Sequence, residues 1–199
     1  MKTTLGPHPD PPLDLATRPL PVTIFRRCWF RIHRLAQAPL FFGRSGDNRF
    51  DAPEGEFGVL YAAKDERCAF IEVFGHATGV RFVEQGELAA RGLARIAPRR
   101  PLRLVNLAGE GLARLGADAR LTSGESYAAA HRWALAIHDH PRRPDGIVYA
   151  ARHDPSRVCA ALFDRASAEL EVTPLGSLAE PAHAALLARL LDAYRFGLV

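Results

Sequence analysis

A glutamate lies in an apolar setting in the first half of the chain. Glu72 is the only charged residue between Cys68 and Phe74. Burying a carboxylate among apolar side chains is unfavourable without a partner, so such a residue is either paired structurally or takes part in chemistry. Tyr61, eleven residues earlier, and His76, four residues later, bring a phenol and an imidazole to the same stretch.

Arginines precede this stretch in two different contexts. Arg31 stands in the short aromatic run 28–33, whereas Arg44 and Arg49 belong to the polar loop 43–55. A guanidinium offers forked donors that match a phosphate, so the loop arginines can wrap one. The ordinary alternatives are an outward strand position for Arg31 and a plain surface loop for 43–55. A loop of this length inside a compact domain is, however, often a binding loop.

The elements that must position these residues follow from the apolar pattern. The apolar run 57–63 predicts a central strand. The next helix is expected to begin near Asp65, where negative charge is favourable, and to end at about Gly75. On that helix Glu72 and His76 are four residues apart, so they can share one face.

The rest of the chain interleaves strands and helices. We predict strands over residues 28–33 (the first strand), 80–83, 93–96, 102–107, 146–151, 158–164 and 170–174. We predict helices over residues 109–115, 127–137 and 182–196, the second of them capped by Ser123 or Ser126. This order predicts a mixed α/β or α+β domain. Neither a GxGxxG fingerprint after the first strand nor a P-loop motif occurs, so a Rossmann site and a P-loop are not supported.

Composition narrows the class of protein. The 199 residues are 48% hydrophobic and carry a net charge of +4. We expect a proline-rich arm over residues 1–22 and one domain over residues 23–199. No dense run of cations occurs, which argues against direct nucleic-acid binding. There is no hydrophobic signal run and no apolar run near the ~18 residues of a membrane span, so we expect a cytoplasmic protein.

A metal site is not expected. The three cysteines are far apart, in apolar contexts and without a CxxC motif, which is typical of buried residues in a reducing cytosol. His138 and His140 flank an aspartate, but no third ligand is near, and Pro141 follows. We therefore interpret the two histidines as a solvated helix end.

Several of these segments together resemble a known family. They are WFRIH with Arg31, NRF with Arg49, GVLYAA with Tyr61, AFIEVFGH with Glu72 and His76, and DGIVYAARHDPSRVCAALFDR. In this order the chain resembles the RES-domain family, the toxin half of bacterial RES–Xre toxin–antitoxin pairs, over about residues 25–165. The ordered set of residues is fairly specific, although no single segment is.

The resemblance implies an ADP-ribosyltransferase-like α+β fold, in which a split β-sheet core has flanking helices and NAD+ binds in a cleft. It implies degradation of NAD+ by hydrolysis or phosphorolysis at the nicotinamide–ribose bond. The implied partner is an Xre-family antitoxin whose C-terminal segment covers the active site, and the resemblance also allows a homodimer within that complex.

The resemblance also implies roles for single residues. Glu72 would stabilise the oxocarbenium-like charge on the ribose and hold its hydroxyls. Tyr61 would stack on the nicotinamide ring or bond its carboxamide, and Arg31 and Arg49 would grip the pyrophosphate. His76 would orient Glu72 or a nearby water.

One position departs from the family pattern. Close relatives often carry a serine in the strand GIVYAA, where Ala150 and Ala151 stand here. Either Ser126 supplies the hydroxyl or this chain lacks it. Two other functions therefore stay open: transfer of ADP-ribose to a host protein, and an inactive module that only binds the antitoxin.

Overall fold

The backbone is built around one large mixed sheet. The computed structural model describes residues 8–77 and 79–199. In this part of the chain, eight strands follow one another in the order β1-β6-β7-β8-β3-β2-β5-β9, and β4 and β10 form a separate pair. Only the β6–β7 and β4–β10 pairings are parallel among these. The strands are β1 Val22–Phe25, β2 Trp29–Arg34, β3 Val59–Ala63, β4 Phe82–Val83, β5 Arg91–Pro98, β6 Leu102–Leu107, β7 Gly146–Ala150, β8 Val158–Phe163, β9 Leu170–Ser177 and β10 Gly197–Leu198.

The large sheet is nearly divided in its middle. The neighbouring strands β3 and β8 pair over five positions, and the neighbouring strands β2 and β5 pair over six. Between β2 and β3, by contrast, a single position is paired, Phe30 with Ala63. This seam separates the group β2-β5-β9 from the rest of the sheet, so the predicted split-sheet α+β core is confirmed.

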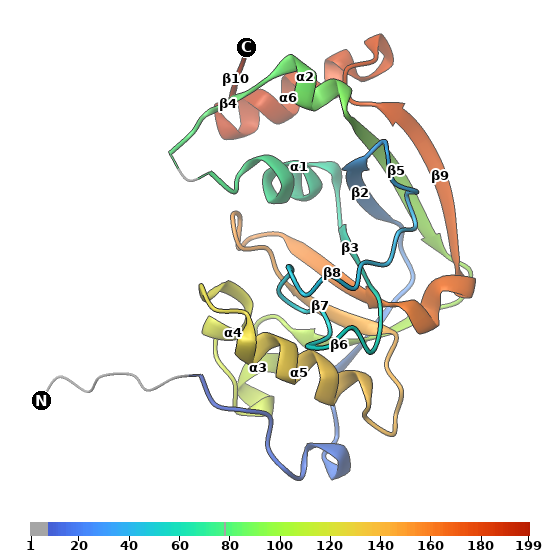
Figure 1. Ribbon diagram of the computed structural model, residues 1–199, viewed down its shortest axis with the longest axis vertical. Coiled ribbons are helices and arrows are strands. Elements are labelled where there is room, and N and C mark those ends of the chain that lie inside the picture. The colour runs from blue at the N-terminus through green and yellow to red at the C-terminus, as the bar shows by residue number, and fades with distance from the viewer. Residues whose placement is uncertain (1–7, 78) are drawn as a thin grey trace, which may run out of the picture.

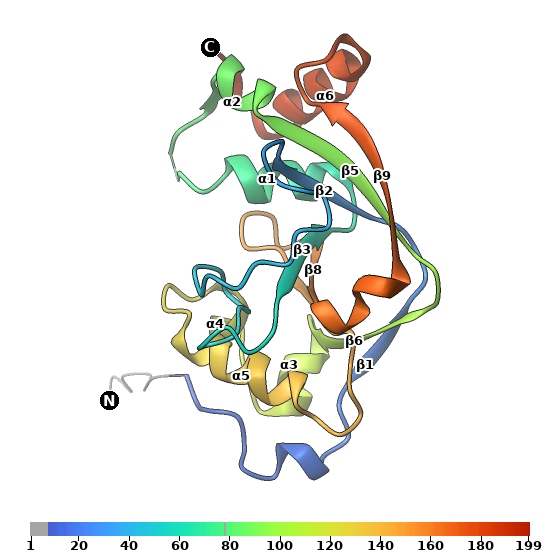
Figure 2. The ribbon, with the colours of Figure 1, turned by 45° about the vertical axis from the view of Figure 1, so that its right-hand side comes forward.

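Helices cover the sheet unevenly. Figures 1 and 2 show α1 running close to β2 and β3, α5 on the part of the sheet that holds β6, β7 and β8, and α2 and α6 together at one end. The α-helices are α1 Glu66–Phe74, α2 Gln85–Ala89, α3 Glu110–Leu115, α4 Arg120–Ser123, α5 Ala128–His138 and α6 Ala184–Tyr194. Short 3-10 turns lie at Leu15–Thr17, Asp164–Glu169 and Pro181–His183.

Alternation along β3 divides the interior into two cores. Successive strand residues point to opposite faces. Val59 and Ala63 belong to the core under α1 and α5, and Tyr61 packs against the same core. Leu60 and Ala62 belong to a second core on the other face, together with Trp29. The face that carries Tyr61 is therefore the face on which α1 lies.

Four features differ from the sequence predictions or extend them. The run 28–33 is not the first strand, because β1 precedes it and pairs with β6 at the edge of the sheet. The short helices α2 and α4 were not predicted. His140 is not at a solvated helix end: it is 2% exposed and its ring bonds the Arg18 carbonyl and the Arg142 amide. His138 is also packed, because its ring stacks on Phe57 with centroids 4.1 Å apart.

The beginning of the chain packs on the domain as far as the structure describes it. Leu15 and Leu20 are buried in the main core, and the indole of Trp133 on α5 donates to the Pro9 carbonyl. Residues 1–7 of the predicted arm lie outside the described residues, and the division at residue 22 stays a prediction. No described helix is long and apolar enough to span a bilayer.

Candidate functional site

A cavity of about 500 Å³ opens at the seam of the sheet. It is lined by β2 and β3, by α1, by the loop 43–55 and by the turn 151–157 between β7 and β8. Of the six site residues predicted from the sequence, five line it: Arg31, Arg49, Tyr61, Glu72 and His76. A cavity of this size lies within the range of small-molecule and cofactor sites.

Helix α1 delivers the carboxylate. The helix begins at Asp65, whose side chain accepts a hydrogen bond of 2.8 Å from the amide of Cys68. Two turns later, Glu72 lies half-buried in the cavity wall, and its Oε1 accepts a 3.0 Å hydrogen bond from the main-chain N–H of His153. No salt bridge to Glu72 occurs within the described residues, so its negative charge remains available to a ligand.

Arg49 is a buried cation that lines the same cavity as this carboxylate. The residue is 7% exposed, and its guanidinium lies 4.6 Å from the centre of the Tyr127 ring. In the described part of the chain, both terminal nitrogens are buried without a hydrogen-bond partner. Burial lowers the pKa of Arg49, an effect that Tyr127 and Glu72 oppose. Buried charges normally have partners, so this arrangement indicates a site for an anionic group.

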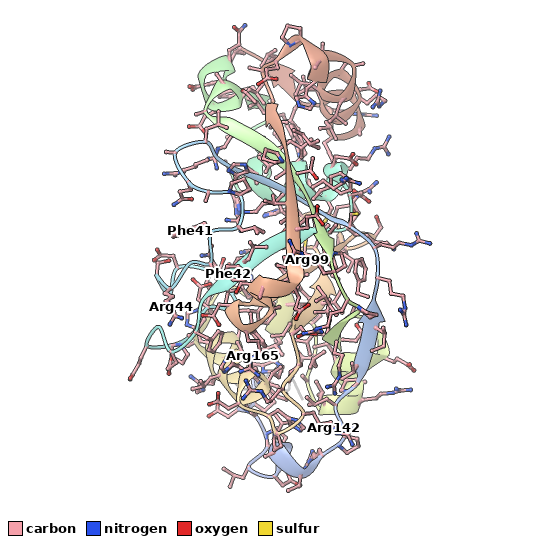
Figure 3. All side chains as sticks on the ribbon, turned by 90° about the vertical axis from the view of Figure 1, so that its right-hand side faces the viewer. Phe41, Phe42, Arg44, Arg99, Arg142 and Arg165 are labelled. Atoms are coloured by element: carbon pink, nitrogen blue, oxygen red, sulfur yellow. The ribbon has the colours of Figure 1, made fainter. Side chains whose placement is uncertain are left out.

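Arg31 adds a second cation at the seam. It comes from β2, and one of its terminal nitrogens donates to the Phe41 carbonyl at 3.1 Å. Burial lowers its pKa to about 10, so the side chain stays charged at neutral pH. Arg44 of the loop does not line the cavity. It forms an ion pair of 2.5 Å with Asp164, and Figure 3 shows it beside Phe41 and Phe42.

Tyr61 anchors the loop that carries Arg49. Its hydroxyl accepts from the amide of Phe50 at 2.8 Å and donates to the buried carboxylate of Asp51 at 2.9 Å. Burial, followed by the charge of Asp51, raises the pKa of Tyr61 well above its usual value, so the phenol stays protonated. The hydroxyl is therefore engaged by the loop, whereas the ring lines the cavity.

We expect Tyr61→Phe to lower the free energy of unfolding by about 1–3 kcal/mol, because a buried amide and a buried carboxylate each lose a partner. Urea denaturation measures this change. Tyr127→Phe is the matched control, since the Tyr127 hydroxyl makes no hydrogen bond within the described residues. Equal losses in the two variants would show that the hydroxyl of Tyr61 does not hold the loop.

The histidine predicted from the sequence has a neighbour that was not predicted. His76 is exposed at the cavity, and its ring lies 5.1 Å from the ring of His153, at 77°. The Nε2 atom of His153 is buried without a partner in the described structure, and burial lowers the pKa of this imidazole. Arg152 also lines the cavity. Both residues lie in the turn 151–157; the sequence favours a turn position for Arg152 over a ligand contact, whereas the structure places it in the cavity wall.

The sixth predicted residue lies elsewhere. Ser126 is exposed just before α5, where its Oγ accepts from the amide of Ala128 at 3.4 Å, and it does not line the cavity. Among the described residues, Ser45 of the loop brings a serine to the cavity wall instead. The predicted cap by Ser123 or Ser126 is wrong as well, because α5 has Tyr127 at its N-cap and no side-chain capping hydrogen bond.

Together, the cavity residues can bind an anionic group and stabilise a developing cation. Arg31, Arg49 and Arg152 supply positive charge, and Glu72 supplies a fixed carboxylate. Aromatic walls from Tyr61 and Tyr127 can hold a planar ring between these groups. Within the described residues, no cluster of histidine, cysteine and carboxylate side chains has the arrangement of a metal site.

Comparisons with known proteins agree with this architecture. The family model of the RES domain matches residues 28–183. A curated probable toxin of Sinorhizobium fredii, y4kH, is 32% identical over 92 residues, which make up 46% of this chain and 72% of that protein. A chain in the crystal structure of the M. tuberculosis MbcT–MbcA toxin–antitoxin complex has the same fold, with a TM-score of 0.64 and 14% identity over 86% of this chain and 92% of that one.

Proposed function

Because the chain belongs to the RES-domain family, we propose that it is the toxin of a toxin–antitoxin system and that it cleaves the bond between nicotinamide and ribose in NAD+. The observation that carries the proposal is the pairing of opposite charges in one cavity. Arg49 is a buried cation whose terminal nitrogens have no hydrogen-bond partner among the described residues, and it lines the same 500 Å³ space as the carboxylate of Glu72. NAD+ combines an anionic pyrophosphate with a ribose that becomes cationic as the bond to nicotinamide breaks, which matches these two charges.

In the proposed reaction the arginines bind the substrate, and the carboxylate stabilises the charge that develops on the ribose. Arg49 and Arg31 bind the pyrophosphate through forked donors, which fixes the position of the attached ribose. The bond from ribose C1′ to the ring nitrogen then breaks, and its electron pair neutralises the positive charge of the pyridinium. Nicotinamide therefore leaves as a neutral molecule, without a strong general acid.

Glu72 acts on the sugar in this scheme. Loss of nicotinamide leaves an oxocarbenium-like ribose, as in glycoside hydrolysis. A carboxylate held in place by the His153 amide stabilises that charge without having to reorganise. Water or phosphate then adds to C1′; when water attacks, its oxygen bonds to C1′ and its proton passes to the solvent. We also propose His76 as the residue that orients this acceptor, since it lines the same cavity as Glu72 and is exposed.

The direct test is to incubate the purified protein with NAD+, with and without phosphate, and to measure free nicotinamide. Release of nicotinamide together with ADP-ribose or its phosphate supports the proposal. Labelled NAD+ in a lysate tests the alternative: a discrete labelled protein band would favour ADP-ribose transfer instead. If the wild-type protein leaves NAD+ intact in both assays, the proposed chemistry is wrong.

The proposed partner is an antitoxin of the Xre family. One relative is a probable toxin, and the structural neighbour belongs to a toxin–antitoxin complex. Expression of this chain alone should then arrest growth, and co-expression of the antitoxin should restore it. Normal growth after expression of the folded protein alone would argue for the inactive binding module.

A further inference from the structure

The turn 151–157 connects the cavity to the outer part of the fold. Its residues Arg152 and His153 line the cavity, and the main-chain N–H of His153 is the donor to Glu72. Figures 1 and 2 show this turn, at the tip of the β7–β8 hairpin, on the same side of the sheet as α1. The position of one oxygen of Glu72 thus depends on the position of a main-chain segment.

Asp154 holds this segment from its other side. Its Oδ2 accepts from the hydroxyl of Tyr194 on α6 at 2.8 Å and from Nε of Arg157 at 3.0 Å. Its Oδ1 accepts from the amide and the hydroxyl of Ser156, at 3.2 and 2.5 Å. Four donors from three residues therefore converge on one carboxylate.

Arg157 extends the network to the start of α1. Its NH1 lies 2.6 Å from Oδ2 of Asp65, whose other oxygen caps the helix at Cys68. The same turn thus contacts α1 twice, at its N-cap through Arg157 and two turns later through the His153 amide and Glu72. A rigid turn fixes both the helix and its carboxylate.

The charges in this network persist at neutral pH. Burial alone would raise the pKa of Asp154, but the hydrogen bonds from Ser156, Tyr194 and Arg157 hold it below its usual value. Burial and the bond to Asp154 raise the pKa of Tyr194 to about 12, so its hydroxyl stays a donor. The side chains of Asp154 and Arg157 are 21% and 22% exposed, which limits screening of the pair by salt.

We propose that Asp154 is a positioning residue for Glu72. Asp154 fixes the turn 151–157, and this turn holds the His153 amide that donates to Glu72. This inference rests on the proposed function for its catalytic consequence, whereas its structural half can be measured without NAD+. Asp154 does not line the cavity, so it acts through the turn and not on the substrate.

The test compares Asp154→Asn and Tyr194→Phe with a matched control, Asp118→Asn. Asp118 also pairs with an arginine, at 2.7 Å, but lies away from the cavity. Because small displacements of a catalytic group are costly, we expect Asp154→Asn to lower kcat for nicotinamide release about tenfold or more, with KM for NAD+ within about twofold. Tyr194→Phe, which removes one hydrogen bond, should show a smaller loss in the same direction, and the control should behave as the wild type.

A second measurement is hydrogen exchange at the His153 amide, followed by NMR. We expect this amide to exchange about tenfold faster in Asp154→Asn, while amides within α5 keep their wild-type rates. A purely structural defect would instead accelerate exchange throughout the domain. If Asp154→Asn fails to fold, Tyr194→Phe decides by the same two readouts.

The outcomes separate the inference from the proposed function. A wild-type protein that releases no nicotinamide refutes the proposed function, and the exchange rate at His153 still decides whether Asp154 fixes the amide. Unchanged exchange in Asp154→Asn overturns the inference whatever happens to kcat. Faster exchange at wild-type kcat also overturns it, because the fixed amide would then be irrelevant to catalysis.

Discussion

Glu72→Gln is expected to lower kcat for nicotinamide release by about a hundredfold or more while KM for NAD+ changes little. The substitution keeps the shape of the side chain and an oxygen that can accept from the His153 amide. It removes the negative charge, which is needed only when the ribose becomes cationic. Loss of one electrostatic contact at a transition state typically costs about 3 kcal/mol, which corresponds to this factor.

The matched control for this prediction lies on the same helix. Glu66→Gln changes a carboxylate in the first turn of α1 that does not line the cavity, so it should retain wild-type kcat. A kcat for Glu72→Gln within about threefold of the wild-type value would exclude Glu72 as the residue that stabilises the sugar. A raised KM with unchanged kcat would instead assign it to substrate binding.

Arg49→Met is expected to weaken NAD+ binding and to leave the free protein as stable as the wild type, or more stable. Methionine is flexible enough to fill the space of the guanidinium stem. The variant loses charged hydrogen bonds to the pyrophosphate, worth about 1.5–3 kcal/mol, so Kd should rise about tenfold to a hundredfold. The free protein no longer buries a cation whose terminal nitrogens lack hydrogen-bond partners in the described structure, which should stabilise it by about 1–3 kcal/mol.

Calorimetry with NAD+ and urea denaturation of the free protein measure the two effects. Arg44→Met is the control, because Arg44 lies in the same loop but is exposed and paired with Asp164. It should leave Kd unchanged. A less stable Arg49→Met variant that binds NAD+ normally would show that this guanidinium serves the fold and not the ligand.

Local sequence pattern was sufficient to predict three central strands of the sheet and the helix α1. The apolar runs at β6, β7 and β8 are bounded by turn residues, so period and length identify them. Helix α1 has an N-cap at Asp65 and a glycine after its last residue, and both signals are local. The short helices α2 and α4 lack such signals, since helices of four or five residues owe their stability to tertiary packing.

Site residues could be predicted from the sequence only where the chemical type of the side chain indicates its role. Arg49, Tyr61 and Glu72 have chemical types that stand out from their surroundings, and each lines the cavity. The partner of Glu72 is a main-chain N–H that lies 81 residues away, which almost any residue type supplies. The hydroxyl of Tyr61 binds Asp51, a contact that depends on how the loop folds back. Neither contact leaves a pattern in the sequence.

The single paired position between β2 and β3 has a mechanical consequence. Strands that are paired along their whole length move together. The strand group β2-β5-β9 and the rest of the sheet are paired at one position only, so they can rotate relative to each other with little loss of hydrogen bonding. Arg31 lies on β2, in the first of these strand groups, and Tyr61 lies on β3, in the other. Pivoting at Phe30 and Ala63 would therefore change the distance between Arg31, the proposed phosphate anchor, and Tyr61, the proposed ring-binding wall. We expect the cavity to open or close most easily at this seam.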